Sequence, residues 1–285
     1  MLVCLDIEKI YSKKPIEKII SFFKRSEVNK TIIKENGVCV LSVDYKQYYG
    51  KINFEKIYDL TIGNPKTILC SKDISLKNTP FTRFDNKDYN RKMMENFICN
   101  ILKNTNTENL SVSFYDPEGD YASLAEMIID YIPRLRIVSN MPRFYENESD
   151  RITEKNGASY IVDNSIQTIA PCDILIAPSS VNIPIPTGSD TLIFTPTRPP
   201  VPVRGIVIYD YYPEIPLWCK RIKPDYIEDN YFLSGLYSLC DRYELSHLQP
   251  IKCGNDNITL NAENILQYVA SRHRTEHIHR EAIPV

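Results

Sequence analysis

Residues 111–128 read SVSFYDPEGDYASLAEMI, and this stretch decides how the second half of the chain folds. The apolar run at residues 110–115 predicts a buried strand, and the apolar spacing after residue 121 predicts an amphipathic helix. A short acidic loop at residues 116–120 joins them. The stretch therefore predicts a strand, a tight turn and a helix, which is the opening unit of an α/β fold.

The same alternation of strand and helix continues toward residue 245. Short apolar runs bounded by polar residues predict the further strands. These runs lie at residues 135–140, 159–162, 172–180, 190–196 and 205–211. A polar helix is predicted at residues 145–157 and a closing helix at residues 230–245. Strands that alternate with helices at this spacing predict a mostly parallel sheet with right-handed crossovers.

Residues 1–106 predict a smaller α/β unit that precedes this sheet. Its predicted strands begin at Met1, Gly37 and Lys66, and a strongly periodic helix is predicted at residues 86–106. A polar run, NTNTEN, follows that helix. We therefore expect a domain boundary near residue 107, with an N-terminal domain at residues 1–106. The second domain, with the C-terminal helices, is expected at residues 107–285.

The order of segments from residue 110 to about 245 resembles the cofactor domain of shikimate dehydrogenases and glutamyl-tRNA reductases. The segments RIVSNMPRFYE and CDILIAPSS are similar to the second and fourth strands of that domain with their following loops. The segment IYDYYPEIPLW resembles a strand followed by Tyr-Asn-Pro, with Tyr212 and Pro213 in place and a tyrosine where the family has asparagine. The resemblance implies a Rossmann-like α/β fold, a mostly parallel sheet with flanking helices.

The loop after the first strand lacks the glycines with which this fold holds a pyrophosphate. The working motif uses one glycine for the turn, one for close approach of the phosphate and one for helix packing. A register that begins at Asp116 puts Glu118 and Tyr121 at the other two positions, and no register puts glycine at two of the three. The sequence therefore argues against a conventional dinucleotide site.

Three carboxylates, Asp116, Glu118 and Asp120, lie where the phosphates would sit. At an effective dielectric near 20, an added anion would meet repulsion on the order of several kcal/mol. Three uses of this loop remain open. The carboxylates could cap their own helix, bind a divalent metal through oxygen, or hold a cationic or polyhydroxy ligand at the strand ends.

Two other loops complete the predicted ligand site. Asn140 lies 24 positions after Asp116, near the usual place of a ribose-binding residue, and Arg143 would favour a 2′-phosphate, so NADP is the better candidate if a dinucleotide binds. A serine-rich loop follows the strand at residues 172–180. The candidate ligand-binding residues are Asp116, Glu118, Gly119, Asp120, Asn140, Arg143, Ser179 and Ser180.

Composition excludes several classes of function. The 285 residues include 34 basic and 36 acidic side chains, so no global charge attracts nucleic acid or anionic lipid. No apolar run reaches membrane-spanning length and no secretory leader is evident, so we expect a cytoplasmic protein without a membrane partner. The eight cysteines are scattered, which favours reduced thiols and no metal site.

The sequence thus predicts a protein with a degenerate Rossmann-like domain and no dinucleotide cofactor. Its predicted role is to bind a small-molecule ligand or to interact with a partner, and a homo-oligomer is left open. The alternative is an NADP-dependent oxidoreductase with a variant phosphate loop, in which Arg143 contacts the 2′-phosphate.

Overall fold

The chain forms two compact units. The computed structural model describes residues 1–10, 22–61, 66–86, 88–145, 159–169, 172–240, 242–269 and 271, and of residues 159 and 160 only the backbone. The first unit comprises Met1–Asn86 and Ile215–His247, and the second comprises Lys87–Glu214 and Leu248–Val285. This division differs from the predicted boundary near residue 107 and from a continuous second domain. The helix predicted at residues 145–157 lies almost entirely outside the described residues.

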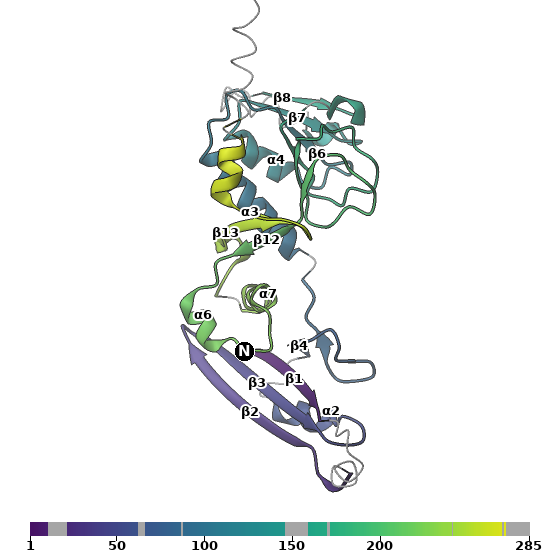
Figure 1. Cartoon of the computed structure of the whole chain (residues 1–285), viewed down its shortest axis with the longest axis vertical. Coiled ribbons are helices and arrows are strands. Elements are labelled where there is room, and N and C mark those ends of the chain that lie inside the picture. The colour runs from purple at the N-terminus through teal and green to yellow at the C-terminus, as the bar shows by residue number, and fades with distance from the viewer. Residues whose placement is uncertain are drawn as a thin grey trace, which may run out of the picture. The chain divides into compact units, whose positions relative to one another are not determined.

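The first unit contains a five-stranded sheet in the order β2-β3-β1-β4-β5 (Figure 1). Its strands are β1 (Leu2–Lys9), β2 (Glu27–Glu35), β3 (Val38–Gln47), β4 (Thr67–Cys70) and β5 (Thr82–Arg83). All neighbours are parallel except β2 and β3, which form an antiparallel hairpin. The hairpin turns at Asn36 and Gly37, whose φ angles of 49° and 78° suit a type I′ turn. Strands β1, β3 and β4 agree with the prediction, whereas β2 was missed.

Helices from distant parts of the sequence cover this sheet. Helix α2 (Phe54–Leu60) buries Ile57 in the apolar cluster formed by one face of the strands. Helices α6 (Leu217–Ile222) and α7 (Asp229–Leu239) belong to the same unit. Gly235 of α7 lies so close to Leu69 of β4 that an added Cβ would be 2.7 Å from a Leu69 methyl. The predicted closing helix therefore completes the first unit, because its apolar face packs on that sheet.

The second unit contains a six-stranded parallel sheet in the order β11-β10-β9-β6-β7-β8 (Figure 1). Its strands are β6 (Val112–Tyr115), β7 (Arg134–Val138), β8 (Ser159–Asp163), β9 (Ile174–Ile176), β10 (Leu192–Phe194) and β11 (Ile206–Ile208). Numbered along this sheet, the order is 3-2-1-4-5-6, which is the strand order of the Rossmann fold. The predicted strands and the parallel sheet are confirmed.

Helices α3 (Tyr89–Lys103) and α4 (Ala122–Ile129) belong to this unit. Helix α3 buries the apolar face that its periodicity predicted, and Phe97 packs its ring near Phe194 and Tyr211. The β9–β10 and β10–β11 connections, which are described throughout, contain no helix. Prolines interrupt both connections and remove the N–H groups that a helix would need.

A small antiparallel sheet completes the second unit. Strands β12 (Asp210–Pro213), β13 (Pro250–Gly254) and β14 (Thr259–Asn261) form it, and residues 262–269 are helical. The strand predicted at residues 205–211 is therefore two strands in different sheets. Within the described residues, no helix is long and apolar enough to cross a membrane. All eight cysteines are free, and burial raises the pKa of the Cys253 thiol to about 12.

Two carboxylates face each other on the first sheet. Asp6 of β1 and Asp44 of β3 are direct neighbours in the parallel register. Burial, and then the charge of Asp6, raise the pKa of Asp44, while a hydrogen bond from Ser42 opposes the shift. A raised folded-state pKa stabilises the fold below the unfolded pKa of about 3.9, and this contribution is lost as the pH rises through the folded value.

Asp44→Asn is therefore expected to increase the free energy of unfolding at pH 7, because it removes the charge that the fold disfavours. The gain should shrink as the pH falls toward about 4. Urea unfolding from pH 3.5 to 7.5 measures this difference. Asp59→Asn, which removes an exposed carboxylate of α2, is the matched control. A gain for Asp44→Asn that does not depend on pH would contradict the prediction.

Candidate functional site

The candidate site lies at the carboxyl ends of β6, β7 and β9. Strands β6 and β9 are neighbours, and the strand order proceeds in opposite directions from this pair, through β7 and β8 on one side and β10 and β11 on the other. In open α/β sheets this point, where the strand order reverses, is where ligands bind. Tyr115 at the end of β6 and Ala177 after β9 lie in one apolar cluster below the site.

Asp116 occupies the position of the first motif glycine, and its side chain is completely buried. One carboxylate oxygen accepts the backbone N–H of Gly119 at 3.2 Å, and the other accepts that of Tyr121 at 2.9 Å. Tyr121 is the N-cap residue of α4. The Tyr145 hydroxyl also donates to Asp116. The loop was predicted to cap its own helix, but α4 has no side-chain cap hydrogen bond. Asp116 instead accepts N–H groups within the loop that leads into the helix, and its negative charge lies near the helix N-terminus, where the helix dipole favours it.

The loop after β7 closes over the acidic loop. The backbone N–H of Asn140 donates to the Pro117 carbonyl at 3.1 Å. Gly119 has a φ of +77°, and a Cβ built there would be 2.7 Å from the Phe144 ring and 3.2 Å from Met141. The side chains of Met141 and Phe144 therefore cover Gly119, where a pyrophosphate would approach a glycine loop. The aromatic content of RFYE was the only sequence signal for this contact.

Glu118 and Asp120 remain exposed at the rim of the loop. Burial, and then the charge of Glu118, raise the pKa of Tyr115. Burial also raises the pKa of Tyr121, and the charges of Asp116 and Asp120 contribute to that shift although Arg91 opposes it. Both tyrosines therefore lie close enough to the carboxylates of the loop to be affected by their charge. Within the described residues, no group of three metal-ligating side chains is assembled.

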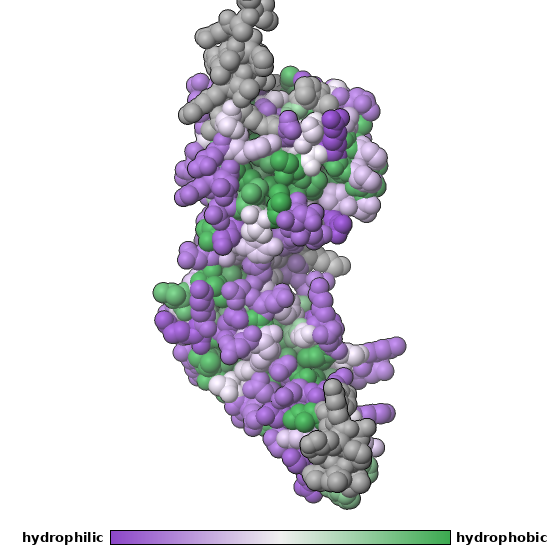
Figure 2. Space-filling model, viewed as in Figure 1, coloured by the Kyte–Doolittle hydropathy of each residue, from purple (hydrophilic) through white to green (hydrophobic). Residues whose placement is uncertain are grey.

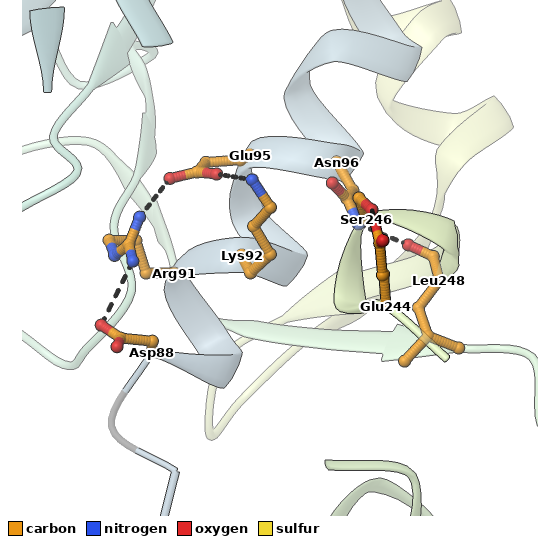
Figure 3. Close-up of polar contacts among 8 residues, drawn as sticks. All are labelled: Asp88, Arg91, Lys92, Glu95, Asn96, Glu244, Ser246 and Leu248. Carbon is orange, nitrogen blue, oxygen red and sulfur yellow. Dashed lines mark hydrogen bonds and ion pairs between the residues drawn. The ribbon is translucent and has the colours of Figure 1, made fainter. Parts of the chain in front are cut away.

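Helix α3 supplies a cation that the sequence did not indicate. The Arg91 guanidinium lies over the Tyr121 ring, 5.3 Å from its centroid. Figure 3 shows Arg91 bonded to Asp88 at 3.2 Å and to Glu95 at 2.6 Å, while Lys92 bonds the second Glu95 oxygen at 2.8 Å. Glu95 is only 6% exposed. This network holds Arg91 against the residue that begins α4.

The predicted residues after β9 differ in environment. The Ser179 hydroxyl oxygen is buried and has no hydrogen-bond partner among the described residues. Ser180 is exposed, and its hydroxyl lies 3.0 Å from that of Thr197. A buried hydroxyl without a partner is unfavourable unless a ligand or water satisfies it. Of the two serines, Ser179 is therefore the better candidate for a ligand contact.

Asn140 and Arg143 lie on the loop after β7 with exposed side chains. The backbone of Asn140 joins this loop to the acidic loop, as described above. The structure thus brings the β6 and β7 loops together, and Ser179 and Ser180 follow the strand next to β6.

Gly119→Ala is expected to lower the free energy of unfolding by about 1.5 kcal/mol, because the positive φ strains an alanine and its Cβ meets Phe144. Urea unfolding measures the loss. Gly50→Ala is the matched control for φ alone, since Gly50 has a φ of +79° and nothing within 4 Å of an added Cβ. Phe144→Ala should partly rescue Gly119→Ala. Equal losses at the two glycines, without rescue, would contradict the contact.

Comparisons with known proteins concern the fold. No protein-family model and no curated protein matches the chain. Among solved structures, quinate dehydrogenase from Corynebacterium glutamicum in complex with NAD is 10% identical over 69% of this chain and 80% of that chain, with a TM-score of 0.31. Shikimate dehydrogenase in complex with NADP+ is 10% identical over 68% and 76%, with a TM-score of 0.29. L-tryptophan dehydrogenase from Nostoc punctiforme is 8% identical over 85% and 75%, with a TM-score of 0.29.

The second unit is a Rossmann-like α/β domain by its strand order and parallel sheet. The order and direction of β6 to β11 carry this assignment, since the similarity to each solved structure is low. Within that fold class, the chain departs from the working dinucleotide motif at Asp116.

Proposed function

We propose that the second unit binds a small ligand at the carboxyl edge between β6 and β9, without a phosphate contact at the N-terminus of α4. The buried Asp116 carboxylate carries this proposal. It already accepts the N–H groups of Gly119 and Tyr121, so a pyrophosphate would have to displace a charged group from two hydrogen bonds.

The surroundings of the site suggest the chemistry of the ligand. Glu118 and Asp120 make the rim negative, and Ser179 offers a buried hydroxyl at the neighbouring strand. Carboxylates and hydroxyls bind amines and polyhydroxy compounds through charge-assisted and neutral hydrogen bonds. The proposed ligand is therefore a small cationic or polyhydroxy molecule.

Calorimetric titration separates this proposal from dinucleotide binding. We expect neither NADPH nor NADH to bind with a dissociation constant below about 1 mM. In a thermal-shift panel of amines and polyols, Ser179→Val should reduce the shift given by any compound that stabilises the wild-type protein. Ser123→Val, at an exposed position of α4, is the control. Saturable micromolar binding of NADPH would overturn the proposal.

A second candidate function is an NADP-dependent oxidoreductase with a variant phosphate loop. The exposed Arg143 on the loop after β7 favours it, because a guanidinium at this position suits a 2′-phosphate. In that case Arg143→Ala should weaken NADPH binding about tenfold and leave NADH binding unchanged. Arg134→Ala, at the opposite end of the same strand, is the matched control. Equal effects on the two cofactors would exclude this role for Arg143.

A further inference from the structure

Strand β2 is a long, exposed edge of the first sheet. It occupies one end of the strand order and is antiparallel to β3 over nine residues. Seven of these residues are exposed, including Ile32 at 41% and Ile33 at 37%. On the face drawn in Figure 2, hydrophilic residues predominate and hydrophobic areas lie among them. No described strand pairs with the outer side of β2, and such an edge is a template for another strand.

The hairpin geometry decides which backbone groups of β2 point outward. In a two-residue hairpin, the residues that flank the turn exchange both hydrogen bonds, and the bonded positions then alternate. Glu35 and Val38 flank the turn, so Glu35 and the odd-numbered residues of β2 bond to β3. The outward N–H and C=O groups therefore belong to the even-numbered residues, which are Val28, Lys30, Ile32 and Lys34.

We propose that β2 pairs antiparallel with β2 of a second copy of this chain, about a two-fold axis at Lys30. In a symmetric antiparallel pair, residues with outward backbone groups must lie opposite one another. The two-fold axis must therefore pass beside a residue of β2, and a register with the axis between two consecutive residues is excluded. Centring on Lys30 places Val28 opposite Ile32 twice on the apolar-cluster face. It also places the exposed Arg25 opposite Glu35 twice, where Arg25 would share a carboxylate that Arg221 of the same copy already bonds.

Charge distinguishes this register from those centred on Thr31 and Ile32, whereas a pairing centred on Asn29 would lose the Val28–Ile32 pairs. A pairing centred on Thr31 would place Glu27 opposite Glu35 twice, and one centred on Ile32 would place Lys30 opposite Lys34 twice. Like charges directly opposite are destabilising, whereas apolar and opposite-charge pairs are favourable. The Lys30 register contains one like-charge pair, at the axis, and two Arg25–Glu35 pairs whose carboxylates are shared with Arg221. The dimer is therefore weak and depends on protein concentration.

Sedimentation velocity over about 1–500 μM tests the proposal on the full chain. We expect a reversible monomer–dimer equilibrium that Lys30→Thr tightens about fivefold, because it removes the lysine pair and adds a strand-forming residue. Ile32→Lys should abolish dimerisation. Thr31→Lys, which changes the charge by the same amount on the opposite face, should weaken dimerisation less. Circular dichroism confirms that each variant is folded.

Oxidative crosslinking identifies the register. Lys30→Cys should give a disulfide-linked dimer, because residue 30 faces its own copy, and Ile32→Cys should not, with the wild-type protein as the control for native thiols. A wild-type protein and a Lys30→Thr variant that are both monomeric at the highest concentration would overturn the proposal. A dimer that Ile32→Lys leaves intact, or that crosslinks at residue 32 instead, would overturn it as well. This inference is independent of the ligand site in the second unit.

Discussion

Asp116→Ala is expected to lower the free energy of unfolding by about 3 kcal/mol, the largest loss among the variants considered for this chain. The carboxylate is completely buried and accepts hydrogen bonds from two backbone N–H groups and from the Tyr145 hydroxyl. Hydrogen bonds to a charged group contribute about 1.5–3 kcal/mol each and are not additive. Alanine would also leave a cavity and remove the charge from the N-terminus of α4.

Urea unfolding of four variants tests how this loss arises. Asp116→Asn keeps the shape and one acceptor oxygen, so it should lose less than Asp116→Ala. Tyr145→Phe removes one donor and should lose about 1 kcal/mol. Glu118→Ala, at the exposed rim, should change stability by less than about 0.5 kcal/mol. If Asp116→Ala and Glu118→Ala behave alike, Asp116 is not the internal anion of this loop.

The same variants bear on function. If the Asp116 carboxylate excludes a pyrophosphate, then Asp116→Gly is the one change that both empties the site and restores a motif glycine. An increase in NADPH affinity in Asp116→Gly, measured by calorimetry, would support the proposed exclusion. If the wild-type protein binds NADPH and the Asp116→Gly variant does not, then Asp116 supports NADPH binding and does not exclude it.

Arg91→Ala is expected to lower the free energy of unfolding by about 2.5 kcal/mol. It removes the 2.6 Å bond to the buried Glu95, the bond to Asp88 and the contact with the Tyr121 ring. Because Lys92 retains its own bond to Glu95, the loss of stability is smaller than for a buried carboxylate that has lost every ion-pair partner. The cation–π contact contributes on the order of 0.5–1 kcal/mol of this total.

Arg91→Lys is the informative control for this network. Lysine keeps the charge but loses the planar guanidinium that bonds two carboxylates and stacks on a ring. We therefore expect Arg91→Lys to recover less than half of the loss. A double-mutant cycle with Tyr121→Leu, measured by urea unfolding, isolates the ring contact. In the Tyr121→Leu background, Arg91→Ala should cost less free energy of unfolding, and the difference is the contribution of the contact between Arg91 and the Tyr121 ring. Additive effects of the two substitutions would show that Arg91 does not act on the loop through Tyr121.

Local pattern was sufficient for the parallel strands and for α3 and α4 of the second unit, but not for the antiparallel strands β12, β13 and β14. The strands β6, β7, β9 and β10 are short apolar runs, and α3 has apolar residues at helical spacing, so their sequences identify them. The acidic loop was also predictable, since a missing glycine is visible in the sequence itself. The two backbone partners of Asp116 lie only three and five residues away, although the predicted side-chain cap of α4 did not form.

The contacts that define the site were not predictable in the same way. Tyr145 lies 29 residues from Asp116, and Arg91 lies on a helix that precedes the strand, so no local spacing connects them to the loop. The same holds for α6 and α7, which return to the first unit after the second unit has begun. A helical period shows that a face will be buried and does not show which surface buries it.

The sequence by itself determined the class of fold, because hydrophobic period and turn chemistry act over a few residues. It also determined that the phosphate loop lacks its glycines and contains three carboxylates. Only the tertiary structure decided that one of these carboxylates is buried as an internal anion while the other two stay exposed. The burial of Asp116 depends on which segments pack against the acidic loop at the edge of the sheet. These segments are the loop after β7 and helix α3, which are distant from it in the sequence.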